Sequence, residues 1–287
     1  MSTRTEKETG AGLDVIAECG SRSDPGRVRE NNEDSLCLAP ELKLFVLSDG
    51  MGGQASGEVA SRLATETIVA YCREAQVTPS SANTGMLIAG ASDNANRLAS
   101  AIRLANRVVN QAAEQNSERR GMGATVVAVW LSDERVSVAH VGDSRAYRLR
   151  GKEFEQLTED HSFVAEQVRR GTMTPEEAAT SKLQNVLLRA LGVDPEVEVE
   201  VGEQVLLEGD TILLCSDGLT RELSDAQIAA VLGDTEDSQE AADRLVDSAN
   251  QAGGEDNISA IVVRNVAKSA GAFTRMGRWF KGSENHS

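Results

Sequence analysis

Apolar residues along the chain gather in short runs separated by Gly, Asp, Asn and Ser. Runs of about five to eight residues rich in Val, Ile and Leu are typical of β-strands. They predict strands at residues 13–19, 42–47, 124–131, 135–141, 146–150, 197–201, 211–215 and 258–263.

A different spacing, with apolar residues three and four apart, predicts helices between these strands. Residues 58–73 and 97–113 each carry four apolar side chains near one face, namely Val59, Leu63, Ile68 and Val69 in the first and Leu98, Ile102, Ala105 and Val109 in the second. A third helix is expected at 238–250, with Asp237 as its N-cap, Glu240 completing a capping box, and a Gly-Gly pair ending it.

Strands and helices do not alternate regularly, which favours a mixed α+β fold with largely antiparallel sheets. Residues 77–96 are rich in small polar side chains and predict a surface loop between two helices. The charged stretch 159–182 contains a Gly-Thr-Met-Thr-Pro break and is expected to form a helical flap over a neighbouring surface. We expect a disordered leader at 1–12 and one domain over 13–266.

Charge narrows the possible functions. The chain has 29 basic and 45 acidic residues, a net charge of -16, which argues against a nucleic-acid-binding protein and suits one that concentrates cations or meets basic partners. There is no apolar run long enough for a transmembrane helix and no apolar signal core. The four cysteines form no C-x-x-C motif, so we expect reduced thiols and a cytoplasmic location.

Acidic residues stand at the ends of several predicted strands. Asp49-Gly50 and Asp217-Gly218 each close an apolar run, and Asp143 follows a third. Two further acidic segments precede strands, Glu33-Asp34 and Glu255-Asp256. A single Asp-Gly is usually a turn, but five such sites that converge would repel one another unless cations neutralised them.

Oxygen ligands without histidine or cysteine suit hard ions such as Mn²⁺ or Mg²⁺, and a glycine beside the aspartate lets a backbone carbonyl approach as well. Two cations about 3.5–4 Å apart can share a water, lower its pKa and clamp a phosphoryl group for in-line attack. Arg29 lies five residues before Asp34 and is a candidate phosphate anchor, or otherwise a solvated loop charge.

Several of these segments belong to a series of motifs that follow one another in a recognisable order over about residues 13–263. They are Ser23-Asp24-Pro25-Gly26-x-Val28-Arg29-x-x-Asn32-Glu33-Asp34, Asp49-Gly50-Met51-Gly52-Gly53, Gly121-Met122-Gly123-Ala124-Thr125, Val141-Gly142-Asp143-Ser144-Arg145, Ser216-Asp217-Gly218-Leu219 and Gly254-Glu255-Asp256-Asn257. Together they resemble the metal-dependent protein phosphatase (PPM, or type 2C) family in its bacterial form. The resemblance implies an α-β-β-α sandwich of two mainly antiparallel sheets flanked by helix layers.

The resemblance also implies roles for individual residues. Asp49 would bridge two Mn²⁺ or Mg²⁺ ions, with the Gly50 carbonyl on one of them and Asp217 and Asp256 completing one shell. Asp34, and Glu33 through water, would support the metals or their waters, Asp143 would help hold a third, weaker metal, and Arg29 would bind the substrate phosphate. The implied catalytic residues are Arg29, Asp34 and Asp49.

One position departs from the eukaryotic pattern of the family. Met51 stands where a histidine commonly follows the Asp-Gly pair and is thought to protonate the leaving alkoxide. Methionine cannot donate a proton, so a metal-bound water is expected to do so. His161 is an alternative donor, although a structural role is the better interpretation of that residue.

Three alternatives compete with this interpretation. Cys215 and Arg221 fit the C-x5-R signature of cysteine phosphatases, but Asp217 between them would oppose a thiolate. The glycines after Asp49 imitate a dinucleotide fingerprint, but the aspartate would face a pyrophosphate and the βαβ unit is missing. A non-catalytic phosphoprotein-binding regulatory module of the same fold would usually have lost its metal-binding aspartates, which are present here.

The predicted function is therefore metal-dependent hydrolysis of phosphoserine and phosphothreonine in proteins, without a covalent phosphoenzyme. The expected partners are phosphorylated proteins, with a cognate serine/threonine kinase and its substrates by analogy, and the protein is expected to be a monomer. The basic and aromatic segment 267–287 is a candidate contact for a partner or a membrane surface, or a disordered tail.

Overall fold

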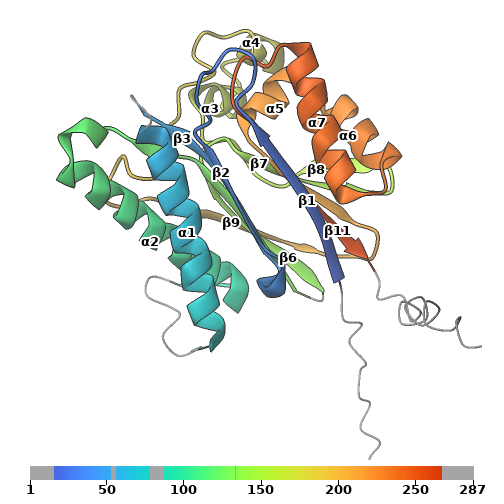
Figure 1. The fold of residues 1–287 in the computed structure, drawn as a ribbon, viewed down its shortest axis with the longest axis horizontal. Coiled ribbons are helices and arrows are strands. Elements are labelled where there is room, and N and C mark those ends of the chain that lie inside the picture. The colour runs from blue at the N-terminus through green and yellow to red at the C-terminus, as the bar shows by residue number, and fades with distance from the viewer. Residues whose placement is uncertain (1–15, 53–55, 78–86, 133, 267–287) are drawn as a thin grey trace, which may run out of the picture.

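Two antiparallel β-sheets are stacked face to face, and helices cover both outer faces (Figure 1). The computed structural model describes residues 16–52, 56–77, 87–132 and 134–266. The predicted leader and the predicted tail lie outside these residues. The four layers confirm the α-β-β-α arrangement that the resemblance implied.

The first sheet has the strand order β1-β11-β10-β7-β8, and every neighbouring pair is antiparallel. Its strands are β1 (Ile16–Asp24), β7 (Arg145–Arg150), β8 (Glu153–Gln156), β10 (Thr211–Cys215) and β11 (Ile258–Val266). β1 extends beyond the predicted 13–19, because residues through Asp24 pair with β11. The first and last strands of the domain therefore lie side by side.

The second sheet has the order β2-β3-β5-β6-β9, with β4 paired to the end of β3. Its strands are β2 (Asp34–Ala39), β3 (Leu44–Met51), β4 (Gly123–Ala124), β5 (Val126–Leu131), β6 (Arg135–Val141) and β9 (Glu200–Val205). β9 starts later than the predicted 197–201, because its register with β6 begins at Glu200. In β2 and β3, Asp34 pairs directly with Asp49.

Helices cover each sheet separately. α1 (Ser56–Val77) and α2 (Asp93–Gln115) pack on the second sheet, while α5 (Asp217–Glu222), α6 (Asp225–Asp234) and α7 (Ser238–Ala252) cover the first. Short 3-10 helices lie at Pro40–Leu42 and Ser117–Arg119. The Asp237 side chain caps α7 by accepting a hydrogen bond from the Glu240 N–H, which confirms the predicted N-cap but not the reciprocal bond of a capping box within the described residues.

The predicted helix faces were right for α2 and partly wrong for α1. All four apolar residues predicted on the second helix are buried. In α1, Val59 and Leu63 are only half-buried, and the fully buried positions include Ala60 and Ala64. The buried face of α1, which packs against β3 and α2, combines these small side chains with Ile68 and Val69.

The core is formed by three apolar layers, one between the sheets and one under each group of helices. The residues between the sheets include Phe45, Leu47, Val127, Val129, Ile212, Leu214 and Ile261. Burying a side chain of this size contributes roughly 1.5–3 kcal/mol, so the central layer holds the strand ends in place. The packed central layer therefore also fixes the positions of the aspartates at these strand ends.

Two short helices occupy the predicted flap, α3 (Phe163–Arg169) and α4 (Pro175–Ala179). Ser162 caps α3, and Thr174 caps α4 in a reciprocal capping box with Glu177. No helix within the described ranges has both the length and the apolar character needed to cross a bilayer.

Candidate metal centre

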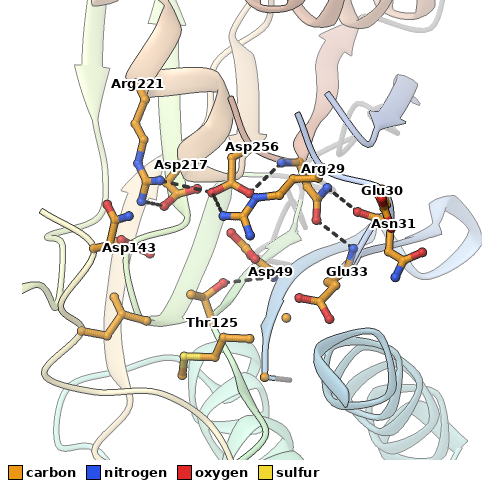
Figure 2. A pocket seen from close by; sticks show the side chains of 16 residues that line it. Arg29, Glu30, Asn31, Glu33, Asp49, Thr125, Asp143, Asp217, Arg221 and Asp256 are labelled. Atoms are coloured by element: carbon orange, nitrogen blue, oxygen red, sulfur yellow. Dashed lines mark hydrogen bonds and ion pairs between the residues drawn. The ribbon is translucent and has the colours of Figure 1, made fainter. Parts of the chain in front are cut away.

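Acidic side chains from both sheets meet around one cavity of about 400 Å³. Figure 2 shows the carboxylates of Asp49, Asp217 and Asp256 on facing sides of it, with Asp143 and Arg221 at one end and Glu33 at the other. The lining also includes Arg29, Gly50, Met51, Thr125, Asn185, Leu187 and Asn257. Residues more than 200 positions apart in the chain thus share one site.

Thr125 holds the end of β3 in place. Its hydroxyl accepts a hydrogen bond from the Asp49 N–H at 3.1 Å, and its own N–H donates to the Asp49 carbonyl at 2.8 Å. The same hydroxyl lies 2.6 Å from the Ser144 hydroxyl, next to Asp143. Thr125 therefore couples the backbone of Asp49 to the turn that carries Asp143.

Gly50 permits a close approach between β3 and the start of α1. A Cβ at Gly50 would lie 2.1 Å from the Gly57 carbonyl oxygen, which no side chain could tolerate. The Gly50 N–H donates to the Glu33 carbonyl at 3.1 Å, and the Gly57 N–H donates to the Glu33 carboxylate. The two glycines thus bring Glu33 to the cavity beside Asp49.

Asp34 lies behind the cavity lining and is held by serines. The Ser216 hydroxyl donates to Asp34 Oδ2 at 3.0 Å and accepts from the Ser259 N–H at 2.9 Å. Asp34 Oδ1 is buried and has no hydrogen-bond partner within the described residues.

Asn257 ties the loop before β2 to the start of β11. Its Oδ1 accepts from the Glu33 N–H at 2.8 Å, and its Nδ2 donates to the carbonyls of Pro25 and Asn31 at 3.1 and 2.8 Å. All three bonds join segments more than 220 residues apart, so Asn257 sets the position of Glu33 relative to Asp256.

Two arginines neutralise part of the acidic charge. Arg29 Nη2 lies 2.9 Å from Asp256 Oδ2, and Arg221 Nη1 lies 3.3 Å from the same oxygen. Arg221 also forms an ion pair with Asp217, one helical turn earlier in α5.

The remaining carboxylates strongly resist ionisation. Burial, followed by the charge of Asp217 and other neighbours, raises the pKa of Asp34 and of Asp143 to about 7. The pKa of Asp49 is raised well above its ordinary value, first by burial and then by Asp34 and Asp217. Burial also raises the pKa of Asp217, although Arg221 opposes that shift. Ionising the whole cluster is therefore costly, and a bound cation would favour the ionised carboxylates.

The donor set fits divalent metal ions. Every candidate ligand is an oxygen, as Mn²⁺ and Mg²⁺ prefer. Both Asp34 Oδ1 and Asp217 Oδ1 are buried without a hydrogen-bond partner in the part of the chain that the structure describes. Buried polar atoms are normally paired, so these oxygens are suited to an ion or its bound water.

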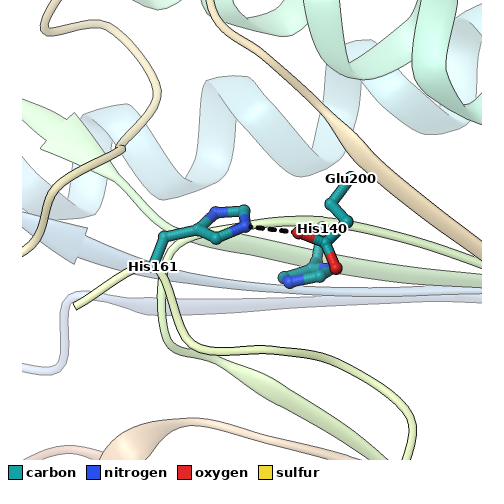
Figure 3. A group of neighbouring side chains, drawn as sticks. All are labelled: His140, His161 and Glu200. Atoms are coloured by element: carbon teal, nitrogen blue, oxygen red, sulfur yellow. Dashed lines mark hydrogen bonds and ion pairs between the residues drawn. The ribbon is translucent and has the colours of Figure 1, made fainter. Parts of the chain in front are cut away.

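A second group of metal-type ligands, His140, His161 and Glu200, lies under the turn that leads to Asp143 (Figure 3). The Gly142 N–H donates to His161 Nδ1 at 3.1 Å, which leaves the ring proton on Nε2, facing Glu200 Oε2 at 3.1 Å. Arg189 Nη1 lies 3.3 Å from that same nitrogen. The proton on His161 Nε2 and the Arg189 guanidinium lie where a metal ion would have to bind. We therefore interpret this group as a hydrogen-bond network.

The same contacts favour a structural role for His161. Its ring stacks on His140 at a centroid distance of 4.7 Å, and burial lowers the pKa of both imidazoles. The side chain is only 4% exposed and does not line the acidic cavity.

The cysteine alternative is wrong. Cys215 is fully buried, and burial raises the pKa of its thiol to about 12, so no thiolate forms near neutral pH. Arg221, the other half of the C-x5-R signature, pairs with Asp217 and Asp256 instead.

The structure brings the sequence-predicted residues together. Seven of them line one cavity, namely Arg29, Glu33, Asp49, Gly50, Asp143, Asp217 and Asp256, and Asp34 lies directly behind. The sequence assigned no part in the site to Arg221, Ser216, Thr125 or Asn257. Of these, Ser216, Thr125 and Asn257 stood inside the recognised segments, which was the available signal.

Comparisons with known proteins point in one direction. The family described as "Protein phosphatase 2C" matches residues 27–262. The serine/threonine phosphatase stp of Listeria innocua is 37% identical over 245 residues, covering 84% of this chain and 93% of that protein. The serine/threonine protein phosphatase PstP of Mycobacterium tuberculosis is 37% identical over 252 residues, covering 88% of this chain and 46% of that protein.

Solved structures agree. A crystal structure of the M. tuberculosis phosphatase PstP/Ppp superposes with a TM-score of 0.77 at 35% identity, covering 88% of this chain and 99% of that one. A PstP catalytic domain in complex with two manganese ions gives a TM-score of 0.75 at 36% identity, with the same coverage.

Proposed function

The chain belongs to the protein phosphatase 2C (PPM) family of metal-dependent serine/threonine phosphatases, and from this premise we propose how its own residues perform the reaction. The observation that carries the proposal is the convergence of five aspartates and Arg29 at one cavity. Its substrates are phosphoserine and phosphothreonine in proteins. The phosphatase domain spans residues 13–266, with a flap at about 159–182.

The acidic cavity would hold two Mn²⁺ or Mg²⁺ ions. Asp49 would serve both ions and the Gly50 carbonyl one of them, Asp217 and Asp256 would complete the ligands of one, and Glu33 would act through water. Asp143 would contribute to a third, weaker site. Bound cations would lower the pKa of a shared water and offset phosphoryl charge for in-line attack.

Arg29 binds the substrate phosphate. Its side chain is 53% exposed and stands at the rim of the cavity, and its guanidinium already reaches Asp256. A fork of two N–H donors matches two phosphate oxygens. Because Arg29 binds phosphate oxygens that do not react, its main contribution is to hold the phosphoryl group in the cavity.

Asp34 and Asp49 orient the attacking water. Asp34 Oδ1 is a buried acceptor without a partner in the described chain, beside Asp49 across the β2–β3 pair. It can accept a hydrogen bond from a water held between the two strands. Met51 lines the cavity without a titratable proton, so the leaving alkoxide receives its proton from water.

The decisive assay is release of phosphate from a phosphoserine and a phosphothreonine peptide with Mn²⁺, and with EDTA in its place. We expect activity only with Mn²⁺, and near-complete loss in Asp49→Asn. An exposed change far from the cavity, Asp234→Asn, is the matched control. A folded protein that binds the phosphopeptide without cleaving it would instead support a non-catalytic module. A cognate serine/threonine kinase is the proposed source of substrates.

A further inference from the structure

Arg221 takes part in the acidic cavity in a way that the phosphatase reaction does not explain. It lies on α5 one turn after Asp217, so both side chains emerge on the same face of the helix. Its guanidinium pairs with Asp217 and also lies 3.3 Å from Asp256 Oδ2. One arginine therefore bridges the two carboxylates assigned to one metal ion (Figure 2).

The two arginines of the site are placed differently. The Arg221 side chain is 27% exposed, against 53% for Arg29, and its partners Asp217 and Asp256 are 14% and 21% exposed. Arg221 thus reaches into the half-buried part of the cluster, whereas Arg29 stays at its rim. The inner arginine compensates the more buried of the two carboxylates.

We propose that Arg221 is an internal counter-ion of the metal centre, which neutralises Asp217 and Asp256 while the cation is absent and is displaced when the cation binds. This inference rests on the proposed function, because it assumes that these carboxylates hold metal. A guanidinium and a divalent cation both need the same carboxylate oxygens, and their positive charges repel each other. Cation binding must therefore break both ion pairs, which lowers the apparent metal affinity.

The structure also provides a place for the displaced side chain. Arg221 lines a second, larger groove of about 1000 Å³ between α5 and the flap helices. Two further carboxylates, Glu222 and Glu255, line this groove, joined by a hydrogen bond of 3.1 Å from the Glu255 N–H. A guanidinium that leaves the metal site can therefore turn toward negative charge in this groove.

The first test is calorimetric titration of the metal-free protein with Mn²⁺ alone. Arg221→Gln should bind Mn²⁺ about tenfold more tightly than the wild type, a coupling of ordinary size. Arg73→Gln, which removes an exposed ion pair with Glu41 outside the cavity, is the matched control and should change the affinity by less than about threefold. Arg221→Lys keeps the charge and should fall between the wild type and Arg221→Gln. Equal affinities for wild type and Arg221→Gln would overturn the inference.

The second test is thermal melting with EDTA and with saturating Mn²⁺. Arg221→Gln should melt below the wild type in EDTA, because buried Asp217 then lacks its counter-charge, and the gap should close with Mn²⁺. An equal gap in both conditions would show a merely structural arginine. Should Arg221→Gln not fold, Arg221→Lys carries both tests, and a wild-type Mn²⁺ affinity in that variant then overturns the inference. A wild type that binds no Mn²⁺ refutes the proposed function itself, and this inference with it.

Discussion

Replacing Asp143 by asparagine should stabilise the metal-free protein near pH 8. Asp143 lies in the turn between β6 and β7, is only 8% exposed, and faces the charges of Asp217 and Asp160. Asparagine has nearly the same shape but no charge, so the change removes an electrostatic cost and leaves the packing intact.

The size of the effect follows from the pKa. Burial and neighbouring charges raise the pKa of Asp143 from 3.8 to about 7 in the folded protein. Because the folded pKa is raised, proton uptake stabilises the fold fully below the unfolded pKa, and this stabilisation is lost as pH rises through about 7. At about pH 8 the ionised aspartate costs up to about 4 kcal/mol, and at about pH 5.5 about 2 kcal/mol, at 1.36 kcal/mol per pKa unit. Four kcal/mol corresponds to roughly 10 °C in melting temperature for a domain of this size.

The measurement is thermal melting of wild type and Asp143→Asn in EDTA at both pH values. We expect the variant to melt higher at about pH 8 and the difference to shrink by about half at about pH 5.5. The matched control is Asp234→Asn at the exposed end of α6, which should stay within about 0.5 kcal/mol at both pH values. If Asp143→Asn melts no higher than the wild type near pH 8, the cluster carries no electrostatic strain and the reasoning fails.

Four further predictions test the site and the core. Gly50→Ala should lose Mn²⁺ affinity and activity, because its Cβ would lie 2.1 Å from the Gly57 carbonyl oxygen; wild-type titration curves would contradict this. Cys215→Ala should keep activity within about twofold, since a thiol with a pKa of about 12 cannot serve as the nucleophile, and an inactive but folded variant would revive the cysteine mechanism. Arg29→Ala should raise KM for a phosphopeptide more than it lowers kcat, and the reverse pattern would remove Arg29 from phosphate binding. Leu98→Ala should lose about 2–5 kcal/mol in urea unfolding, because the side chain is fully buried in α2.

Much of the fold follows from local sequence where burial and periodicity agree. The strands 135–141 and 211–215 match their predicted bounds residue for residue, since nearly every position in them is buried. The acidic strand ends were recognisable for a similar reason. A carboxylate directly after a buried apolar run has to lie at the edge of the core, and the glycine beside it marks close backbone contact.

Other features depend on contacts that local sequence does not reveal. β8 reads Glu-Phe-Glu-Gln and forms because β7 offers an edge to pair with, not because it is apolar. α5 begins at Asp217 itself, where no helix was predicted. That helix is what brings Arg221 to Asp256, a partner 35 residues away, so the arginine could not be assigned to the site in advance.

The pairing of β1 with β11 bears on how the protein is made. Ile258 at the start of the last strand pairs with Asp24 at the end of the first, and Asp256 and Asn257 lie immediately before it. A ribosome must therefore release almost the entire domain before Asp256 and Asn257 can join the other acidic residues. The complete acidic cavity thus forms only late in synthesis.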